Sequence, residues 1–171
     1  NLHNGKMNCY TNLYDYEEYM ESGRPKYSTC IWDRVIWDFD GDNAREMAKK
    51  VSDYLEELNI LHTVIFSGRG YHIYSFIEDN LNTPQLAIRR YQTEVCNILN
   101  IPLSVKHGLD PTSIANGTKI IRIIGTMNIR KEAQRACFGI SKSELCMTHE
   151  EIRELARRLT RNRLFSIGKI S

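Results

Sequence analysis

The chain has 171 residues, 42% of them hydrophobic and 26% charged, an ordinary globular composition that excludes a low-complexity or largely disordered protein. Its 23 basic and 21 acidic residues leave a net charge of +2, so binding to nucleic acid has to come from local clusters of charge. The apolar runs are far too short to cross a membrane. We therefore expect one domain over residues 1–171, large enough for one buried core and with no membrane partner.

The cysteines and the N-terminus indicate a compartment. The five cysteines form no C-x-x-C pair, and the first residues do not form an apolar signal segment. We expect reduced thiols in a cytoplasmic protein. Because the chain begins Asn1-Leu2-His3 without an initiator methionine, we interpret it as a processed or excised piece of a longer protein.

The first regular elements are predicted between residues 30 and 58. Residues 30–40 are predicted to form a strand, because an apolar run leads into alternating side chains. Apolar residues then recur at helical spacing over 44–58, which predicts a helix. Asp42 or Asn43 is expected to cap its start, the latter with Glu46 in the capping-box position.

A hairpin and a second helix are predicted next. Residues 61–66 and 71–77 are rich in β-branched and aromatic residues and flank a Ser-Gly-Arg-Gly turn, as the strands of a hairpin do. Pro84 suits the first turn of a helix that runs to about Leu99.

The remaining chain is predicted to return to strands. Residues 103–105 are short and extended, 119–124 form a strong strand run, and 136–140 a further strand. Thr148 and Glu151 make a capping box that opens a helix through Leu159. Helices interspersed with strands predict an α+β fold with a mixed sheet and flanking helices.

Two aspartates at the end of the first strand are candidate metal ligands. Asp38 and Asp40 are separated by one residue, so their side chains share a face of the strand. Adjacent carboxylates repel each other unless a cation lies between them. Taken alone, the pair is equally compatible with solvated residues at a strand end.

The turn at Ser67-Gly68-Arg69-Gly70 is a candidate anion site. Its glycines expose backbone N–H groups, and the turn carries Arg69 and the nearby His72 toward the neighbouring strand. The alternative is a tight turn with no ligand. A dinucleotide fingerprint is excluded, because a strand-like run follows the turn and a third glycine is missing.

The order of these motifs resembles the archaeo-eukaryotic primase superfamily. A strand-borne Asp-x-Asp at Asp38 and Asp40 is followed by Ser-Gly-Arg-Gly-x-His. A lone Asp110 then precedes the segment that begins at Arg122 and ends in Gly-Thr-Met-Asn, which resembles plasmid and viral members. The resemblance covers roughly residues 8–130 and implies an RRM-like core.

What the resemblance implies is a primase or primase-polymerase, which joins nucleoside triphosphates to a 3′-hydroxyl on a single-stranded DNA template, with or without a primer. Two ions, Mg²⁺ or Mn²⁺, would be held by Asp38, Asp40 and Asp110, which would be the catalytic residues. A helicase or an accessory primase domain would be a partner. The implied nucleotide-binding residues are Ser67, Gly68, Arg69, Gly70, His72, Lys119 and Arg122.

Three other functions remain open. A primer-extending repair polymerase of the same superfamily would carry the same residues. A rolling-circle replication initiator would need a His-hydrophobic-His motif, and His72-Ile73-Tyr74 lacks the second histidine. An RRM-type single-strand binding module would read bases through sheet aromatics and has no use for three carboxylates.

Other polar and aromatic groups favour simpler roles. The spacing of Cys137, Cys146 and His149 does not match a zinc knuckle, so no zinc is expected and buried thiols are favoured. His62 is interpreted as structural. The arginines of residues 153–163 fit a template groove and a solvated helix face equally well. The tyrosines at the N-terminus suit a core edge better than base stacking, and they are Tyr10, Tyr14, Tyr16 and Tyr19.

Overall fold

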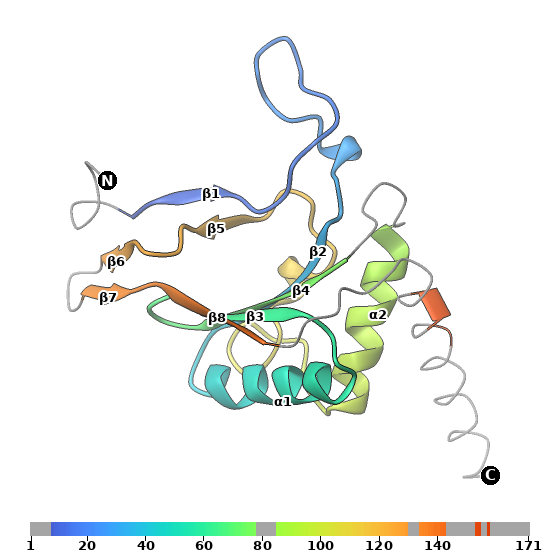
Figure 1. Cartoon of the computed structure of the whole chain (residues 1–171), viewed down its shortest axis with the longest axis vertical. Coiled ribbons are helices and arrows are strands. Elements are labelled where there is room, and N and C mark those ends of the chain that lie inside the picture. Colours follow the sequence, from blue (N-terminus) through green and yellow to red (C-terminus); the bar gives the residue numbers. More distant parts are fainter. Residues whose placement is uncertain (1–7, 78–84, 130–133, 143–152, 155–156, 158–171) are drawn as a thin grey trace.

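A computed structural model of the chain describes residues 8–77, 85–129, 134–142, 153–154 and 157. It has the predicted α+β class, with helices packed on antiparallel strands (Figure 1). The helices are α1 (Ala44–Glu57) and α2 (Gln85–Ile98), with short 3₁₀ turns at Tyr27–Thr29 and Pro111–Ser113. The strands are β1 (Tyr10–Asn12), β2 (Arg34–Phe39), β3 (His62–Phe66), β4 (Tyr71–Phe76), β5 (Ile120–Arg122), β6 (Met127–Ile129), β7 (Gln134–Ala136) and β8 (Phe138–Lys142).

The central sheet has the strand order β2-β4-β3-β8. The β3–β4 hairpin forms as predicted, and β4 pairs with β2 so that Asp38 lies opposite His72. All ladders between the named strands are antiparallel, so the prediction of a mixed sheet is wrong. The reason is that strands of the same direction are never neighbours in this sheet, because β4 lies between β2 and β3, and β3 lies between β4 and β8.

The RRM-like arrangement of this sheet stays a prediction.

The two edges of the sheet have different neighbours. On the free edge of β2, the chain near Leu109 makes an isolated bridge to Phe39. On the opposite edge, β8 pairs with β3 over residues 138–142. The bridge is important for the site, because it brings the chain near Asp110 against the end of β2.

Helix α1 and helix α2 pack through apolar side chains that recur at helical spacing. Met47, Val51 and Leu55 are buried on α1, which covers one face of the sheet (Figure 1). On α2 the buried Tyr91 meets Trp37 of β2 edge to face, with ring centroids 5.7 Å apart. These contacts bury the face of β2 that packs against the helices. Polar side chains of β2 therefore lie on the opposite face.

Gln92 ties α2 to the segment that leads into β5. Its side chain is fully buried, and its Nε2 donates to the carbonyl of Ile36 at 2.6 Å. Its Oε1 accepts from the N–H of Ala115 at 2.9 Å. Because buried polar groups cost free energy when they lack a partner, these bonds hold the 110–119 segment beside β2.

Two smaller ribbons lie across the other face of the sheet (Figure 1). β1 pairs with β5, and β6 pairs with β7. Cys137 lies between β7 and β8, and its N–H donates to the carbonyl of Thr126, just before β6, at 2.9 Å. The space between sheet and ribbons holds the candidate site.

Some predicted boundaries and contacts differ from the structure. Asn43 precedes α1 but makes no side-chain cap bond, because its ψ of 7° lies outside the extended region that capping requires. The strand predicted over 119–124 is only β5, and that over 136–140 is divided between β7 and β8. The predicted helix from Thr148 lies largely outside the described residues. Among those described, no helix combines the length and apolar character needed to span a membrane.

Candidate active site

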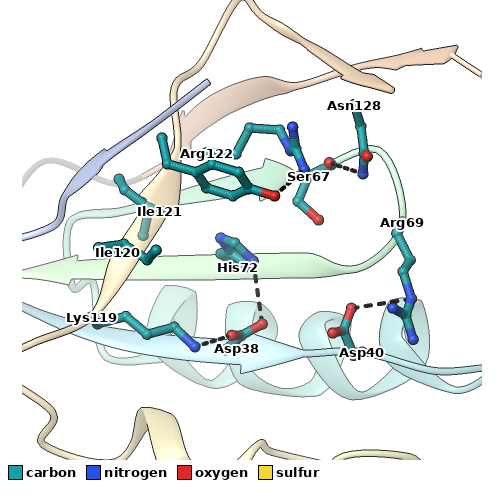
Figure 2. Close-up of a pocket in the computed structure, with 11 residues that line it drawn as sticks. Asp38, Asp40, Ser67, Arg69, His72, Lys119, Ile120, Ile121, Arg122 and Asn128 are labelled. Carbon is teal, nitrogen blue, oxygen red and sulfur yellow. Dashed lines mark hydrogen bonds and ion pairs between the residues drawn. The ribbon is translucent and has the colours of Figure 1, made fainter. Parts of the chain in front are cut away.

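A polar cavity of about 190 Å³ lies between the sheet and the β1–β5 ribbon (Figure 2). Its wall includes two carboxylates from β2 and its end, donors from the β3–β4 turn, and basic side chains from β5 and the residue before it. Segments far apart in the sequence therefore meet at one place. The lining residues are Tyr10, Asp38, Asp40, Ser67, Arg69, His72, Lys119, Ile120, Ile121, Arg122 and Asn128.

Asp38 lies at the centre of the site and has two partners. Oδ1 is 3.2 Å from Nε2 of His72, its neighbour across β4, and Oδ2 accepts from Nζ of Lys119 at 2.5 Å. An ionised carboxylate only accepts hydrogen bonds, so Nε2 of His72 carries the proton. The resemblance implies that His72 binds the nucleotide. In this structure, however, its ring N–H is directed at Asp38 (Figure 2).

These partners determine the ionisation of Asp38. Burial by itself raises the pKa of this carboxyl, but the hydrogen bonds and charges of His72 and Lys119 outweigh burial and lower the pKa from 3.8 to about 2. A lowered pKa in the folded state stabilises the fold at every pH above the unfolded value. This contribution is lost as the pH falls through the folded value.

We expect acid to destabilise the protein through Asp38. Between about pH 4 and about pH 2 the wild type should lose about 2 kcal/mol of its free energy of unfolding from this group. Asp38→Asn should start less stable and lose correspondingly less over that range. Urea unfolding across the range, in chelator, measures both, with Asp53→Asn on the exposed face of α1 as the control. Equal pH slopes for the wild type and Asp38→Asn would contradict the assignment.

The turn between β3 and β4 is closed by Ser67. Its N–H donates to the carbonyl of Gly70 at 3.0 Å, and its Oγ accepts from the N–H of Gly70 at 3.2 Å. Gly68 has φ of +87°, in the left-handed region that glycine adopts without strain. Asn128 of β6 holds the turn in place, because its Nδ2 donates to the carbonyl of Ser67 at 3.0 Å.

Arg69 extends from this turn over the cavity. Its side chain is half exposed, and Nε is 3.8 Å from Oδ1 of Asp40, which is itself about one third exposed. Such an exposed pair contributes little to stability. Arg69 and Asp40 are therefore the most exposed charged groups of the site, and a ligand in the cavity can reach both.

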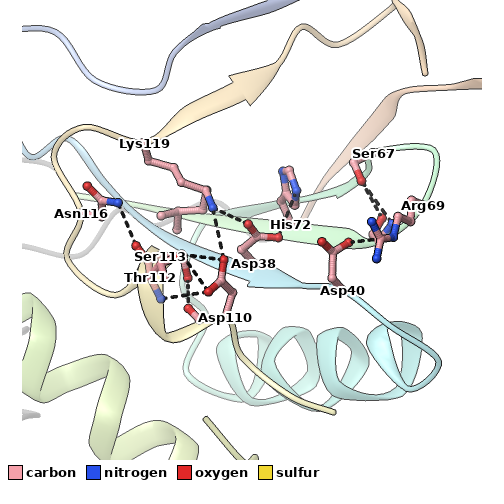
Figure 3. A network of polar contacts seen from close by, with 12 residues as sticks. Asp38, Asp40, Ser67, Arg69, His72, Asp110, Thr112, Ser113, Asn116 and Lys119 are labelled. Atoms are coloured by element: carbon pink, nitrogen blue, oxygen red, sulfur yellow. Dashed lines mark hydrogen bonds and ion pairs between the residues drawn. The ribbon is translucent and has the colours of Figure 1, made fainter. Parts of the chain in front are cut away.

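Asp110 lies beside Asp38, and the ammonium group of Lys119 contacts both carboxylates (Figure 3). Its N–H donates to the carbonyl of Asp38 at 2.9 Å, and its side chain accepts from the N–H of Thr112 at 2.9 Å. Nζ of Lys119 is 3.7 Å from its Oδ2. Asp110 thus caps its own 3₁₀ turn, and Lys119 occupies the space between the two carboxylates.

Arg122 is largely engaged by the protein. Nη1 donates to Oδ1 of Asn8 at 2.8 Å and Nη2 to the hydroxyl of Tyr10 at 2.9 Å, and a longer bond reaches the carbonyl of Met127. Its Cζ is 4.8 Å from the centre of the Tyr10 ring. Arg122 lines the cavity as predicted, but these contacts leave it fewer donors for a phosphate.

The structure therefore brings most, but not all, of the predicted site residues to the cavity. Most of them line the cavity, whereas Asp110 reaches it only through Lys119. Within the described residues, no group of three or more His, Cys, Asp or Glu side chains is spaced to hold a metal ion. The sequence did not point to Asn128, Ile120 or Ile121 as lining residues. Asn128 ends the Gly-Thr-Met-Asn segment, which was the available signal for it.

The remaining candidates have structural surroundings. His62 is buried between Oγ of Ser52 and the carbonyl of Ile60, at 2.9 and 2.8 Å, so its structural interpretation is confirmed. Cys137 is a buried thiol, as predicted, and Cys146 lies outside the described residues.

The N-terminal tyrosines differ from one another in burial. Tyr14 and Tyr16 are buried, as expected of a core edge, whereas Tyr10 and Tyr19 are exposed, and Tyr10 lines the cavity. The basic cluster of residues 153–163 is described only at Arg153 and Arg157.

Comparisons with known proteins identify a related fold. No protein-family model matches the sequence, and no curated protein matches it. Among solved structures, the chain is similar to the polymerase domain of Mycobacterium tuberculosis Ligase D in complex with DNA, with a TM-score of 0.51 and 14% identity. The match covers 90% of this chain and 60% of that one. At this identity the likeness shows a shared fold, and the chain spans about three fifths of the length of that neighbour.

Proposed function

We propose that residues 1–171 are the catalytic domain of a DNA-templated nucleotidyltransferase, a primase or primase-polymerase of the archaeo-eukaryotic primase superfamily. The reaction joins a nucleoside triphosphate to a 3′-hydroxyl on a single-stranded DNA template. The observation that carries the proposal is the cavity, where Asp38 of β2 shares a wall with Asp40, which lies 3.8 Å from Arg69 of the β3–β4 turn. The similarity of fold to a polymerase domain in complex with DNA supports it.

The donor set fits hard divalent cations. Among the described residues that line the cavity are two carboxylates and no cysteine, and carboxylate oxygens are the ligands that Mg²⁺ and Mn²⁺ prefer. Asp38 and Asp40 would hold two such ions, with Asp110 completing the set on the hydroxyl side. When bound, these ions lower the pKa of the attacking hydroxyl and neutralise charge on the departing pyrophosphate.

The side chains around the cavity have complementary roles in this proposal. Arg69 binds the triphosphate through its guanidinium fork, and the backbone N–H groups of Gly68 and Arg69 add uncharged donors, whereas the N–H of Gly70 is already bonded to Oγ of Ser67. His72 keeps Asp38 in one orientation through the 3.2 Å contact. The cavity of about 190 Å³ is smaller than the usual pocket for a whole small ligand, so it accommodates phosphates while the base lies outside.

A primer-extending repair polymerase is the second candidate within the same superfamily. It is favoured by the structural neighbour, which is a polymerase domain from a ligase. The catalytic side chains would be the same in both, so the cavity does not discriminate between them. A helicase or an accessory primase domain is the partner that a primase would need.

The test is incorporation of labelled nucleotides on single-stranded DNA with Mg²⁺ or Mn²⁺, with and without a primer. A primase is expected to give products in both reactions, and a repair polymerase only with the primer. Tight strand binding that needs no metal, with no incorporation in either reaction, would contradict the proposal and favour a binding module. Cleavage of the strand with a covalent tyrosine adduct would instead indicate a rolling-circle initiator.

A further inference from the structure

Lys119 is in an unusual position for a residue that binds nucleotide. Its Nζ is 2.5 Å from Asp38 and 3.7 Å from Asp110, and none of the three side chains is more than 16% exposed (Figure 3). A charge pair this sheltered is screened little by solvent or salt. Lys119 is therefore the cation that balances the two carboxylates in this structure.

The backbone holds Asp38 and Asp110 side by side. The N–H of Asp110 donates to the carbonyl of Asp38, and Gln92 and Leu109 hold the flanking chain against β2. Two carboxylates that share one ammonium group repel each other when that positive charge is removed. A cation therefore stabilises this pair, whether it is Lys119 or a metal ion.

The side chain of Lys119 can move while its backbone stays fixed. Its carbonyl accepts from the N–H of Leu13 at 2.9 Å, and its own N–H donates to the carbonyl of Asn116 at 3.2 Å, so the main chain is held on both sides. The four-carbon stem is flexible and carries a single point charge. The same side chain also lines the cavity, where a triphosphate would offer it new partners.

We propose that Lys119 is an exchangeable counter-cation. It holds Asp38 and Asp110 together in the absence of metal, is displaced from them when a divalent ion binds, and then turns to the triphosphate in the cavity. This inference rests on the proposed function, since it concerns the same carboxylates. Its consequence is that Lys119 weakens metal binding in the absence of nucleotide.

The experiment measures Mn²⁺ binding by calorimetry without nucleotide, for the wild type and for Lys119→Gln. Lys119→Gln is expected to bind about tenfold more tightly, because the ion no longer competes with an ammonium group. Lys119→Arg keeps a cation and should retain the weaker affinity. Lys50→Gln removes the same charge from the exposed face of α1 and serves as the control.

Thermal unfolding gives a second readout. In chelator, Lys119→Gln should melt at a lower temperature than the wild type, and saturating Mn²⁺ should raise its melting temperature by more. If Lys119→Gln does not fold, ¹⁵N NMR of the wild-type lysine ammonium groups replaces it. The Lys119 signal should then change to that of a solvent-exposed ammonium when Mg²⁺ is added.

The outcomes separate this inference from the proposed function. Equal Mn²⁺ affinity in the wild type and Lys119→Gln, or a Lys119 signal unchanged at saturating Mg²⁺, would overturn the exchange while leaving a metal-binding site. No binding of Mn²⁺ to either protein would overturn the proposed function, and the exchange with it.

Discussion

Asp40→Asn is expected to lower the rate of nucleotide incorporation about a thousandfold while leaving the fold unchanged, because a lost ionic metal ligand costs several kcal/mol of transition-state stabilisation. In the structure the carboxylate of Asp40 forms a 3.8 Å ion pair with the half-exposed Arg69, so its effect on the free energy of unfolding should stay within about 0.5 kcal/mol. Single-turnover incorporation on primed DNA measures the first effect, and urea unfolding the second.

The matched control is Asp53→Asn. Asp53 lies on α1, where it pairs with Lys49 on the solvent side, and the substitution removes the same charge. It should incorporate nucleotides at the wild-type rate. An Asp40→Asn protein that also does so, at saturating metal, would rule out Asp40 as a metal ligand.

Gly70→Ala is expected to lower the free energy of unfolding by about 3 kcal/mol and to remove incorporation. An added Cβ would lie 2.2 Å from the carbonyl oxygen of Phe39 and 2.5 Å from Oδ1 of Asp40. Since Phe39 is on β2, the turn and the strand would have to separate. That separation moves Asp40 away from Arg69, so stability and activity fall together.

Gly23→Ala is the control for this substitution. Gly23 has φ of +75° and no heavy atom within 4 Å of its added Cβ, so only backbone strain of about 1 kcal/mol is expected. Denaturant unfolding of both variants gives the comparison. A Gly70→Ala protein as stable as Gly23→Ala would mean that the turn does not pack against β2 as closely as the structure shows.

Local patterns in the sequence predict much of the fold. The apolar spacing of α1 and the β-branched runs around Ser67 and Gly70 are short-range signals, and both elements form as expected. The sequence also predicts that His72 lies toward the neighbouring strand, but the register that places it opposite Asp38 comes from the structure. These features depend on neighbours within a few tens of residues.

Contacts between distant segments are what the sequence does not predict. Nothing near Lys119 in the chain indicates that its ammonium lies between Asp38 and Asp110, because the loop from Ala115 and its tie to Gln92 decide that placement. Arg122 meets Tyr10 across more than a hundred residues. Pairing of β8 with β3 likewise depends on which sheet edge stays open.

The central claim is that the cavity between the sheet and the β1–β5 ribbon is a metal-dependent site for nucleotide transfer. The most direct test compares incorporation on primed single-stranded DNA by the wild type and by Asp38→Ala/Asp40→Ala, with Mn²⁺ and with chelator. We predict products from the wild type with Mn²⁺ only, and none from the double variant even though it remains folded. Equal incorporation by the two proteins, or incorporation by the wild type in chelator, would contradict the claim.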